Sequence, residues 1–254
     1  MTTESDHTVP ISEADVFALL RKSDGAVLVG GQALAFWVAY WGIALAEWPR
    51  EYISGDADFL GFKRHVEAFA KALKGAASYP PQRAMTALVG AVTKRARGGG
   101  RIGVDVLAKL VGLDADGVRK RAIALSDPEN PGKKYLVMNP IDCLVSRMEN
   151  YRKLSDKRNE VGAWHCKIAI LVAHAYLRSL IDLDQERTAI NGATAILRWA
   201  LKPAGLQIFL KEGIDILGAI PIEAFRSALF KEEQYARMTD RIRTERAKRK
   251  PKKR

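Results

Sequence analysis

Three aspartates in short apolar settings are the residues of this sequence best suited to chemistry. Asp56 and Asp58 lie in the segment Ser54-Gly55-Asp56-Ala57-Asp58-Phe59, and Asp105 lies in Arg101–Leu107. Side chains alternate along a strand, so Asp56 and Asp58 are expected on one face, a short distance apart. Asp105 is out of phase with the apolar residues of its segment, which are Ile102, Val104 and Val106. It is therefore expected to face the same cleft from a neighbouring strand.

Carboxylates gathered in this way repel one another unless a cation lies between them. They are also the oxygen ligands that a pair of Mg²⁺ ions uses when substrate phosphates complete the coordination. The alternative is coincidence, because Asp-x-Asp arises often by chance. Asp56 is then a turn residue, and Asp105 pairs with Arg101 or Lys109 at a sheet edge.

A glycine pair, Gly30-Gly31, stands between an apolar strand at 26–29 and an apolar helix expected at 33–46. Such a pair lets backbone N–H groups approach a phosphate, helped by the positive N-terminus of the helix. Two metal ions and this turn together could clamp a triphosphate. The expected reaction is in-line attack by a hydroxyl on the α-phosphorus, with pyrophosphate leaving.

The elements that must position these residues can be read from apolar periodicity and turn signals. Helices are expected at 11–22, 33–46, 64–74 and 114–124, and strands at 26–29, 56–60, 85–93, 101–107 and 135–138. A hairpin turn is expected at 97–100. From Pro140 onward only helical periodicity is evident, at 141–158, 161–181, 184–200 and 221–238. The sequence therefore predicts an α/β half followed by a helical half.

The predicted organisation is a disordered N-terminus at 1–10, an α/β domain at 11–140, a helical domain at 141–238 and a basic tail at 239–254. The net charge of +12 is concentrated at the end of the chain, because residues 241–254 hold nine Lys or Arg and one acid. This tail either binds phosphate backbones non-specifically or solubilises a disordered end. Another basic cluster, at 147–158, is interpreted as a solvated face with Asp142, Glu149 and Asp156 as partners, except for Arg147.

The cysteine content and the N-terminal sequence favour a reduced, cytoplasmic protein. Cys143 and Cys166 are the only cysteines, with no metal-binding spacing, and residues 1–10 are polar. Residues 25–46 carry no charge over 22 positions, but the glycine pair divides them into halves too short to span a bilayer. No membrane association is expected.

The ordered motifs resemble the nucleotidyltransferase superfamily that includes DNA polymerase beta. The most similar group is that of the AbiEii-like nucleotidyltransferases of abortive-infection and type IV toxin–antitoxin systems. The resemblance covers residues 20–160 and depends on four stretches: Gly30 to Ala35, Ser54-x-Asp56-x-Asp58-Phe59, Val104 to Leu107, and Asn139 to Arg147. It implies a mixed sheet flanked by helices, with the catalytic domain at 11–140.

What the resemblance implies for the site is two-metal chemistry. Asp56, Asp58 and Asp105 would be catalytic metal ligands for Mg²⁺. Residues that would contact the NTP co-substrate are Gly30, Gly31, Gln32, Ser54 and Arg147. The acceptor would be an RNA end, first of all tRNA, or a protein, and an antitoxin would be a partner.

Two departures from the family pattern motivate a second hypothesis. Gln32 stands where the family usually has Ser or Thr, and Arg147 replaces the more usual Lys. The alternative function is a catalytically inactive module on this fold that binds nucleic acid or a partner protein.

Overall fold

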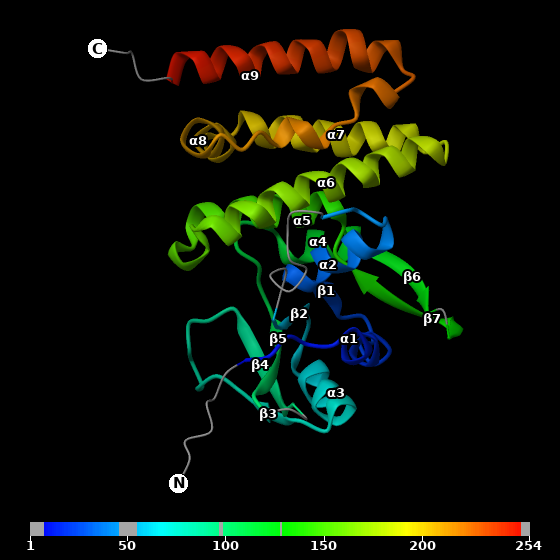
Figure 1. Ribbon diagram of the computed structural model, residues 1–254, viewed down its shortest axis with the longest axis vertical. Coiled ribbons are helices and arrows are strands. Elements are labelled where there is room, and N and C mark those ends of the chain that lie inside the picture. Colours follow the sequence, from blue (N-terminus) through cyan, green and yellow to red (C-terminus); the bar gives the residue numbers. More distant parts are fainter. Residues whose placement is uncertain (1–7, 46–54, 97–98, 128, 250–254) are drawn as a thin grey trace. The chain divides into compact units, whose positions relative to one another are not determined.

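The computed structural model describes residues 8–45, 55–96, 99–127 and 129–249 of the chain (Figure 1). The chain divides into two compact units, each of which is described by itself. The first comprises Met1–Tyr40 with Ala44–Cys143, and the second comprises Trp41–Ile43 with Leu144–Arg254. The first unit is mixed α/β and the second is helical, which confirms the predicted fold class.

A seven-stranded mixed sheet forms the first unit, in the order β3-β4-β5-β2-β1-β7-β6. Two neighbouring pairs are parallel, β2 with β5 and β1 with β7, and the other pairs are antiparallel. The strands are β1 (Val27–Val29), β2 (Ala57–Leu60), β3 (Ala76–Ser78), β4 (Leu88–Arg95), β5 (Arg101–Leu107), β6 (Ile123–Asp127) and β7 (Asn130–Val137).

The inner strands are held by apolar burial. All three residues of β1 are buried, as expected for a strand with neighbours on both sides. In β5 the apolar residues Ile102, Val104 and Val106 are buried and alternate with less buried positions, which confirms the phase predicted for this strand. The sheet thus buries one face of β5 and leaves Asp105 on the other.

The described residues of the first unit form the helices α1 (Glu13–Leu20), α2 (Gly30–Tyr40), α3 (Lys63–Leu73) and α4 (Ala115–Arg121). Ser12 caps α1 by accepting a hydrogen bond from the Asp15 N–H, as the Ser-x-x-Asp pattern predicts. Helix α2 begins at Gly30 and ends at Tyr40, so both of its predicted bounds were wrong. The strand β1 leads into it without a loop.

Several further expectations for this unit differ from the structure. The strands expected at 85–93 and 135–138 are observed at Leu88–Arg95 and Asn130–Val137, and β6 was not predicted. The helix expected at 114–124 ends at Arg121, because residues from Ile123 onward pair with β7. The short strand β3 was not predicted. Residues 8–10 were expected to be disordered, but Thr8 forms a bridge with Arg101 and the Val9 N–H donates to the Arg101 carbonyl at 2.9 Å. This added backbone pairing orders them.

The second unit contains α5 (Pro140–Lys153, which starts at the end of the first unit), α6 (Glu160–Asp182), α7 (Glu186–Leu201), α8 (Pro203–Glu212) and α9 (Ala236–Arg249). Short helical turns lie at Ser155–Lys157 (η2), Ile216–Ala219 (η3) and Ile222–Ala224 (η4), and a π-helix lies at Leu229–Tyr235 (η5). Helix α8 was not predicted, and residues 203–212 fall between two of the expected helices.

The predicted break between a helical domain and a basic tail at residue 239 is not seen. Helix α9 continues through it to Arg249, and both Ile242 and Arg246 are buried. Arg246 donates to both carboxylate oxygens of Asp215, at 2.7 and 2.9 Å, and its guanidinium lies 3.5 Å from the centre of the Phe209 ring. This part of the basic segment is therefore packed into the second unit.

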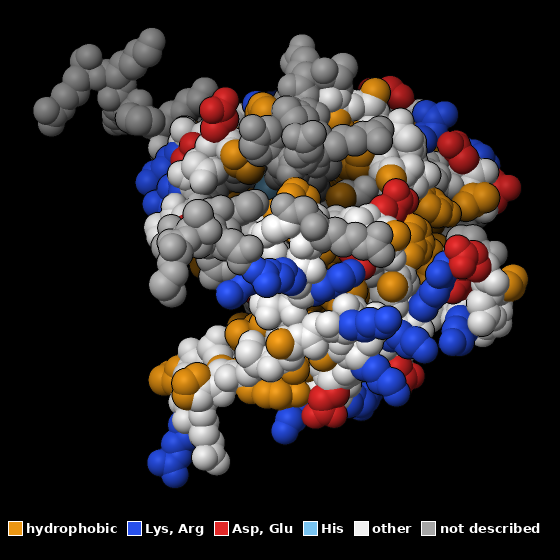
Figure 2. All heavy atoms as spheres, turned by 60° about the horizontal axis from the view of Figure 1, so that its bottom comes forward, with side chains coloured by type: hydrophobic (Ala, Val, Ile, Leu, Met, Phe, Trp, Pro, Cys, Tyr) orange, Lys and Arg blue, Asp and Glu red, His pale blue; other side chains and the backbone are white. Residues whose placement is uncertain are grey.

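None of the described helices combines the length and the apolar composition needed to cross a membrane. One face of the molecule is drawn in Figure 2, where Lys and Arg side chains lie in several places with Asp and Glu side chains among them.

Candidate active site

Asp58 and Asp105 are brought side by side by the strand pairing at the centre of the sheet. They are register partners in the parallel pair β2 and β5, and each is partly buried. Residues that face one another in neighbouring strands point to the same side of a sheet. The two carboxylates therefore share one face, as the alternation in the sequence predicted.

Asp56 reaches the same face from the bend that precedes β2. Its side chain lies against Gly103 of β5, where an added Cβ atom would be 2.9 Å from Asp56 Oδ1 and 3.4 Å from its Cγ. Gly103 precedes Asp105 by two residues, so both positions face the same side of the strand. All three predicted carboxylates are consequently gathered on one side of the β2–β5 pair.

The electrostatics of Asp105 reflect this gathering. Burial raises the pKa of the Asp105 carboxyl above its ordinary value, and the negative charge of Asp56 raises it further. A nearby carboxylate has this effect because it disfavours a second negative charge. A bound cation would remove that penalty, which is the behaviour expected of a divalent-cation site.

Gly30 is held against Asp58 at the junction of β1 and α2. Its backbone has φ of +70°, a conformation that side chains rarely adopt. A Cβ atom there would collide with the Asp58 Oδ2 and would lie 2.8 Å from its Cγ. The structure thus shows that Gly30 leaves room for a carboxylate. Its predicted approach to a phosphate stays a prediction.

The other predicted nucleotide-contacting residues have different positions. Gly31 is buried and Gln32 is partly buried in the first turn of α2, beside Gly30. Ser54 lies outside the described residues. Arg147 lies on α5 in the second unit, where its positive charge opposes the effect of burial that raises the pKa of the Cys166 thiol to about 12. Gly30, Gly31 and Gln32 therefore follow the end of β1 at which Val29 pairs with Asp58.

The three carboxylates match a hard divalent cation in donor type and in charge. Within the described residues, however, no set of three or more acidic, histidine or cysteine side chains is already arranged as ligands of one metal ion. Asp56 is exposed, whereas Asp58 and Asp105 are partly buried on paired strands of the sheet. The chemistry of the donors nevertheless fits Mg²⁺.

Gly103 is the site residue that sequence reasoning missed. A glycine inside an alternating strand pattern is a known signal of close approach by another group, and Gly103 stands in the middle of 101–107. Here the approaching group is the Asp56 side chain, which any larger residue at position 103 would displace.

The basic cluster at 147–158 is largely paired, as expected. Arg152 and Lys153 both contact Glu149, at 3.0 and 3.1 Å, and Lys157 lies 3.4 Å from Asp156. The predicted pairing of Asp142 with this cluster is wrong, because Asp142 accepts two hydrogen bonds from Arg121 of α4 instead.

No protein-family model matches this chain, and no curated protein is similar enough to it to count as a match.

Proposed function

We propose that the chain is a Mg²⁺-dependent nucleotidyltransferase that transfers a nucleoside monophosphate from an NTP to a hydroxyl acceptor. The observation that supports it best is the register pairing of Asp58 with Asp105, with Asp56 lying over Gly103 on the same face. Gathering three carboxylates in this way costs free energy in the absence of a cation. Cations that arrive with the phosphates of a substrate would offset this cost.

The residues take distinct roles in this proposal. Asp56 and Asp58 would hold the cations, and Asp105 would complete one of these sites. Mg²⁺, when bound, supplies charge neutralisation of the phosphates. The acceptor oxygen forms its bond to the α-phosphorus while the bond to the bridging oxygen of pyrophosphate breaks. Asp105 is proposed to accept the hydroxyl proton.

The N-terminus of α2 is proposed to orient the triphosphate. Gly30, Gly31 and Gln32 form its first turn, where backbone N–H groups and the helix dipole favour negative charge. Ser54 and Arg147 are proposed as further contacts to the phosphates. RNA, first of all tRNA, is the preferred acceptor because the chain is strongly basic, and a protein is the second choice. An antitoxin is the proposed protein partner.

The second candidate is an inactive module on the same fold that binds nucleic acid or a partner protein. Two observations favour it. Gln32 lacks the hydroxyl usual at that position in the resembling family, and the carboxylates are not already arranged as a closed metal site in the described residues.

One transfer assay separates the two candidates. The purified chain is incubated with Mg²⁺, each labelled NTP and total RNA or lysate, beside Asp56→Ala and Asp105→Asn. A matched control is Asp116→Asn, which removes an exposed carboxylate on α4. Since metal clamps supply several kcal/mol, we expect label transfer to fall about 100-fold or more in the site variants and to persist in the control.

Chelation with EDTA should abolish transfer by the unmodified chain. The inactive module is supported by two results together. The unmodified chain labels no acceptor with any NTP, and the unmodified chain and Asp56→Ala bind RNA equally well.

A further inference from the structure

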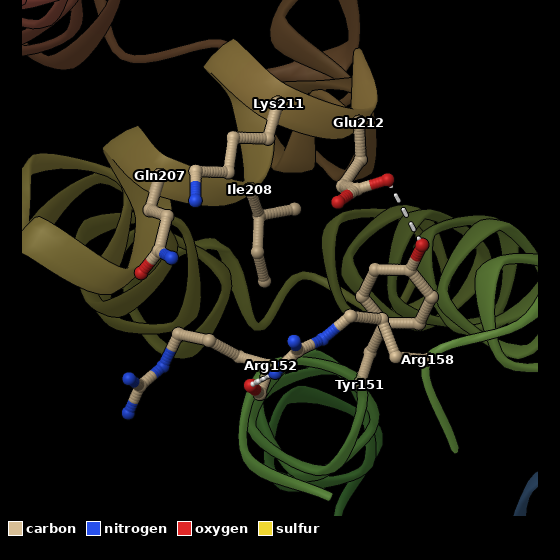
Figure 3. A pocket seen from close by; sticks show the side chains of 7 residues that line it. All are labelled: Tyr151, Arg152, Arg158, Gln207, Ile208, Lys211 and Glu212. Atoms are coloured by element: carbon tan, nitrogen blue, oxygen red, sulfur yellow. Dashed lines mark hydrogen bonds between the residues drawn. The ribbon is translucent and has the colours of Figure 1, made fainter. Parts of the chain in front are cut away.

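A small pocket within the second unit is lined by cations from three separate segments. Its polar lining comes from the last turn of α5, the residue after η2, and α8: Tyr151, Arg152, Arg158, Gln207, Lys211 and Glu212. Figure 3 shows Gln207 and Lys211 projecting from α8 toward the side on which the two arginines lie. The volume is about 90 Å³. This volume is sufficient for one small tetrahedral oxyanion.

The two arginines are held in place but retain free donors. Arg158 donates through Nη2 to the Arg152 carbonyl at 2.6 Å, and Arg152 donates through Nη2 to Glu149 Oε2 at 3.0 Å. Arg152 Nε is buried and has no acceptor among the described residues. A guanidinium has five N–H donors in a fixed plane, so each arginine keeps donors beyond those used in these two hydrogen bonds.

Lys211 and Gln207 add donors from the opposite wall. They are four residues apart on α8 and therefore lie on the same side of this helix. Neither side chain has a hydrogen-bond or ion-pair partner in the part of the chain that the structure describes. The pocket thus offers an ammonium and an amide that nothing in the described residues engages.

The carboxylates near the pocket are already occupied. Glu212 accepts a hydrogen bond from the Tyr151 hydroxyl at 3.0 Å, at the end of the pocket away from the Arg152 guanidinium (Figure 3). Glu149 is buried beneath Arg152 and Lys153. Burial disfavours its charge, but hydrogen bonds from these two cations hold the pKa of Glu149 below its ordinary value. Three cations and one carboxylate line the pocket, so positive charge remains in excess.

We propose that this pocket binds a single phosphate group in the form of a phosphomonoester dianion. Guanidinium groups recognise phosphate oxygens through paired N–H donors, and a lysine adds a mobile point charge. The volume admits one phosphate group, and the rest of a larger phosphorylated molecule would extend into solvent. The group is either the 5′-phosphate of an RNA or part of a small phosphorylated molecule. The proposal does not depend on nucleotidyl transfer.

Binding is measured by calorimetry on the full chain, without Mg²⁺ or NTP, so the outcome is separate from that of the transfer assay. The probes are inorganic phosphate and one short oligoribonucleotide carrying either a 5′-phosphate or a 5′-hydroxyl. Lys211→Gln is compared with Lys167→Gln, which removes the same charge from an exposed position on α6. Loss of a charge-assisted hydrogen bond should raise the Kd for inorganic phosphate about tenfold in Lys211→Gln only.

The two sources of the phosphate give different results. If RNA is the source, the 5′-phosphate strengthens oligonucleotide binding by the unmodified chain but not by Lys211→Gln. If a small molecule is the source, both oligonucleotides bind equally while phosphate binding keeps its dependence on Lys211. Failure to bind inorganic phosphate, or equal weakening by the Lys211 and Lys167 variants, overturns the proposal. Lys211 is exposed, so unchanged urea midpoints will verify that both variants fold.

Discussion

Replacing Gly30 by alanine tests whether this glycine is required by the Asp58 carboxylate. Gly30 has φ of +70°, and an added Cβ atom would strike the Asp58 side chain. A left-handed backbone costs a residue with a side chain about 1–2 kcal/mol. Forcing an atom into occupied space typically adds about 1–3 kcal/mol. We therefore expect Gly30→Ala to lower the free energy of unfolding by about 2–5 kcal/mol.

Gly25 provides a matched control for the backbone term. Its φ is +85°, and an added Cβ atom there would meet nothing within 4 Å. Gly25→Ala should therefore cost only the backbone term, about 1–2 kcal/mol. The free energy of unfolding of both variants is measured by urea unfolding, with circular dichroism as the signal. The difference between the two values is the cost of the contact with Asp58.

A double-mutant cycle then assigns the extra cost to the carboxylate. Shortening Asp58 to alanine removes the colliding oxygen, so Gly30→Ala should cost less in the Asp58→Ala background, with a coupling of about 0.5–3 kcal/mol. The reasoning is refuted if Gly30→Ala and Gly25→Ala are equally destabilising, or if the cost of Gly30→Ala is the same with and without the Asp58 carboxylate.

Two further predictions concern the second unit. Arg246→Ala should lower the free energy of unfolding by about 1–3 kcal/mol, because it removes the charge-assisted hydrogen bonds to Asp215 and uncovers Phe209. Arg243→Ala, at an exposed site on the same helix, should change it by less than about 0.5 kcal/mol, and equal effects would contradict the packed position of Arg246. Glu149→Gln should destabilise the fold at pH 7. Because the folded pKa of Glu149 lies below its unfolded value, this stabilisation is present above about pH 4.3 and is lost as the pH falls further. Urea midpoints of wild type and variant should therefore converge at low pH, and a constant gap would count against the Glu149 contacts.

Local patterns in the sequence were sufficient for elements that carry their own signal. The bounds of β5 were predicted as observed, because apolar residues alternate strictly between Arg101 and Leu107. Strand β3 could not be predicted in this way. Its three residues are small and exposed, and they form a strand only because β4 offers backbone partners. The start of α2 at Gly30 was missed because glycine has a low helix propensity, and the close approach of Asp58 to Gly30 comes from a strand that the local sequence does not show.

The candidate site also depends on contacts between residues that are far apart in the sequence, which local patterns do not predict. Alternation in the sequence predicted that Asp58 and Asp105 point away from the buried apolar side of their strands. Nothing in the local sequence specifies that β2 lies next to β5 or that the two aspartates are in register. That pairing depends on the order of the whole sheet. Gly103 was missed for a related reason: its neighbour, Asp56, is far away in sequence, and only the strand pairing brings them together.

The place of β1 in the sheet has a consequence for how the protein is made. Its two neighbours are β2, which follows soon in the sequence, and β7, which closes the first unit near its end. A chain emerging from the ribosome therefore carries β1 with one edge unpaired until residue 137 has left the exit tunnel. This edge is wholly apolar, and unpaired edges of this kind invite association with other chains. Nascent chains that stall before β7 should thus depend on chaperones, whereas those that stall after it should not.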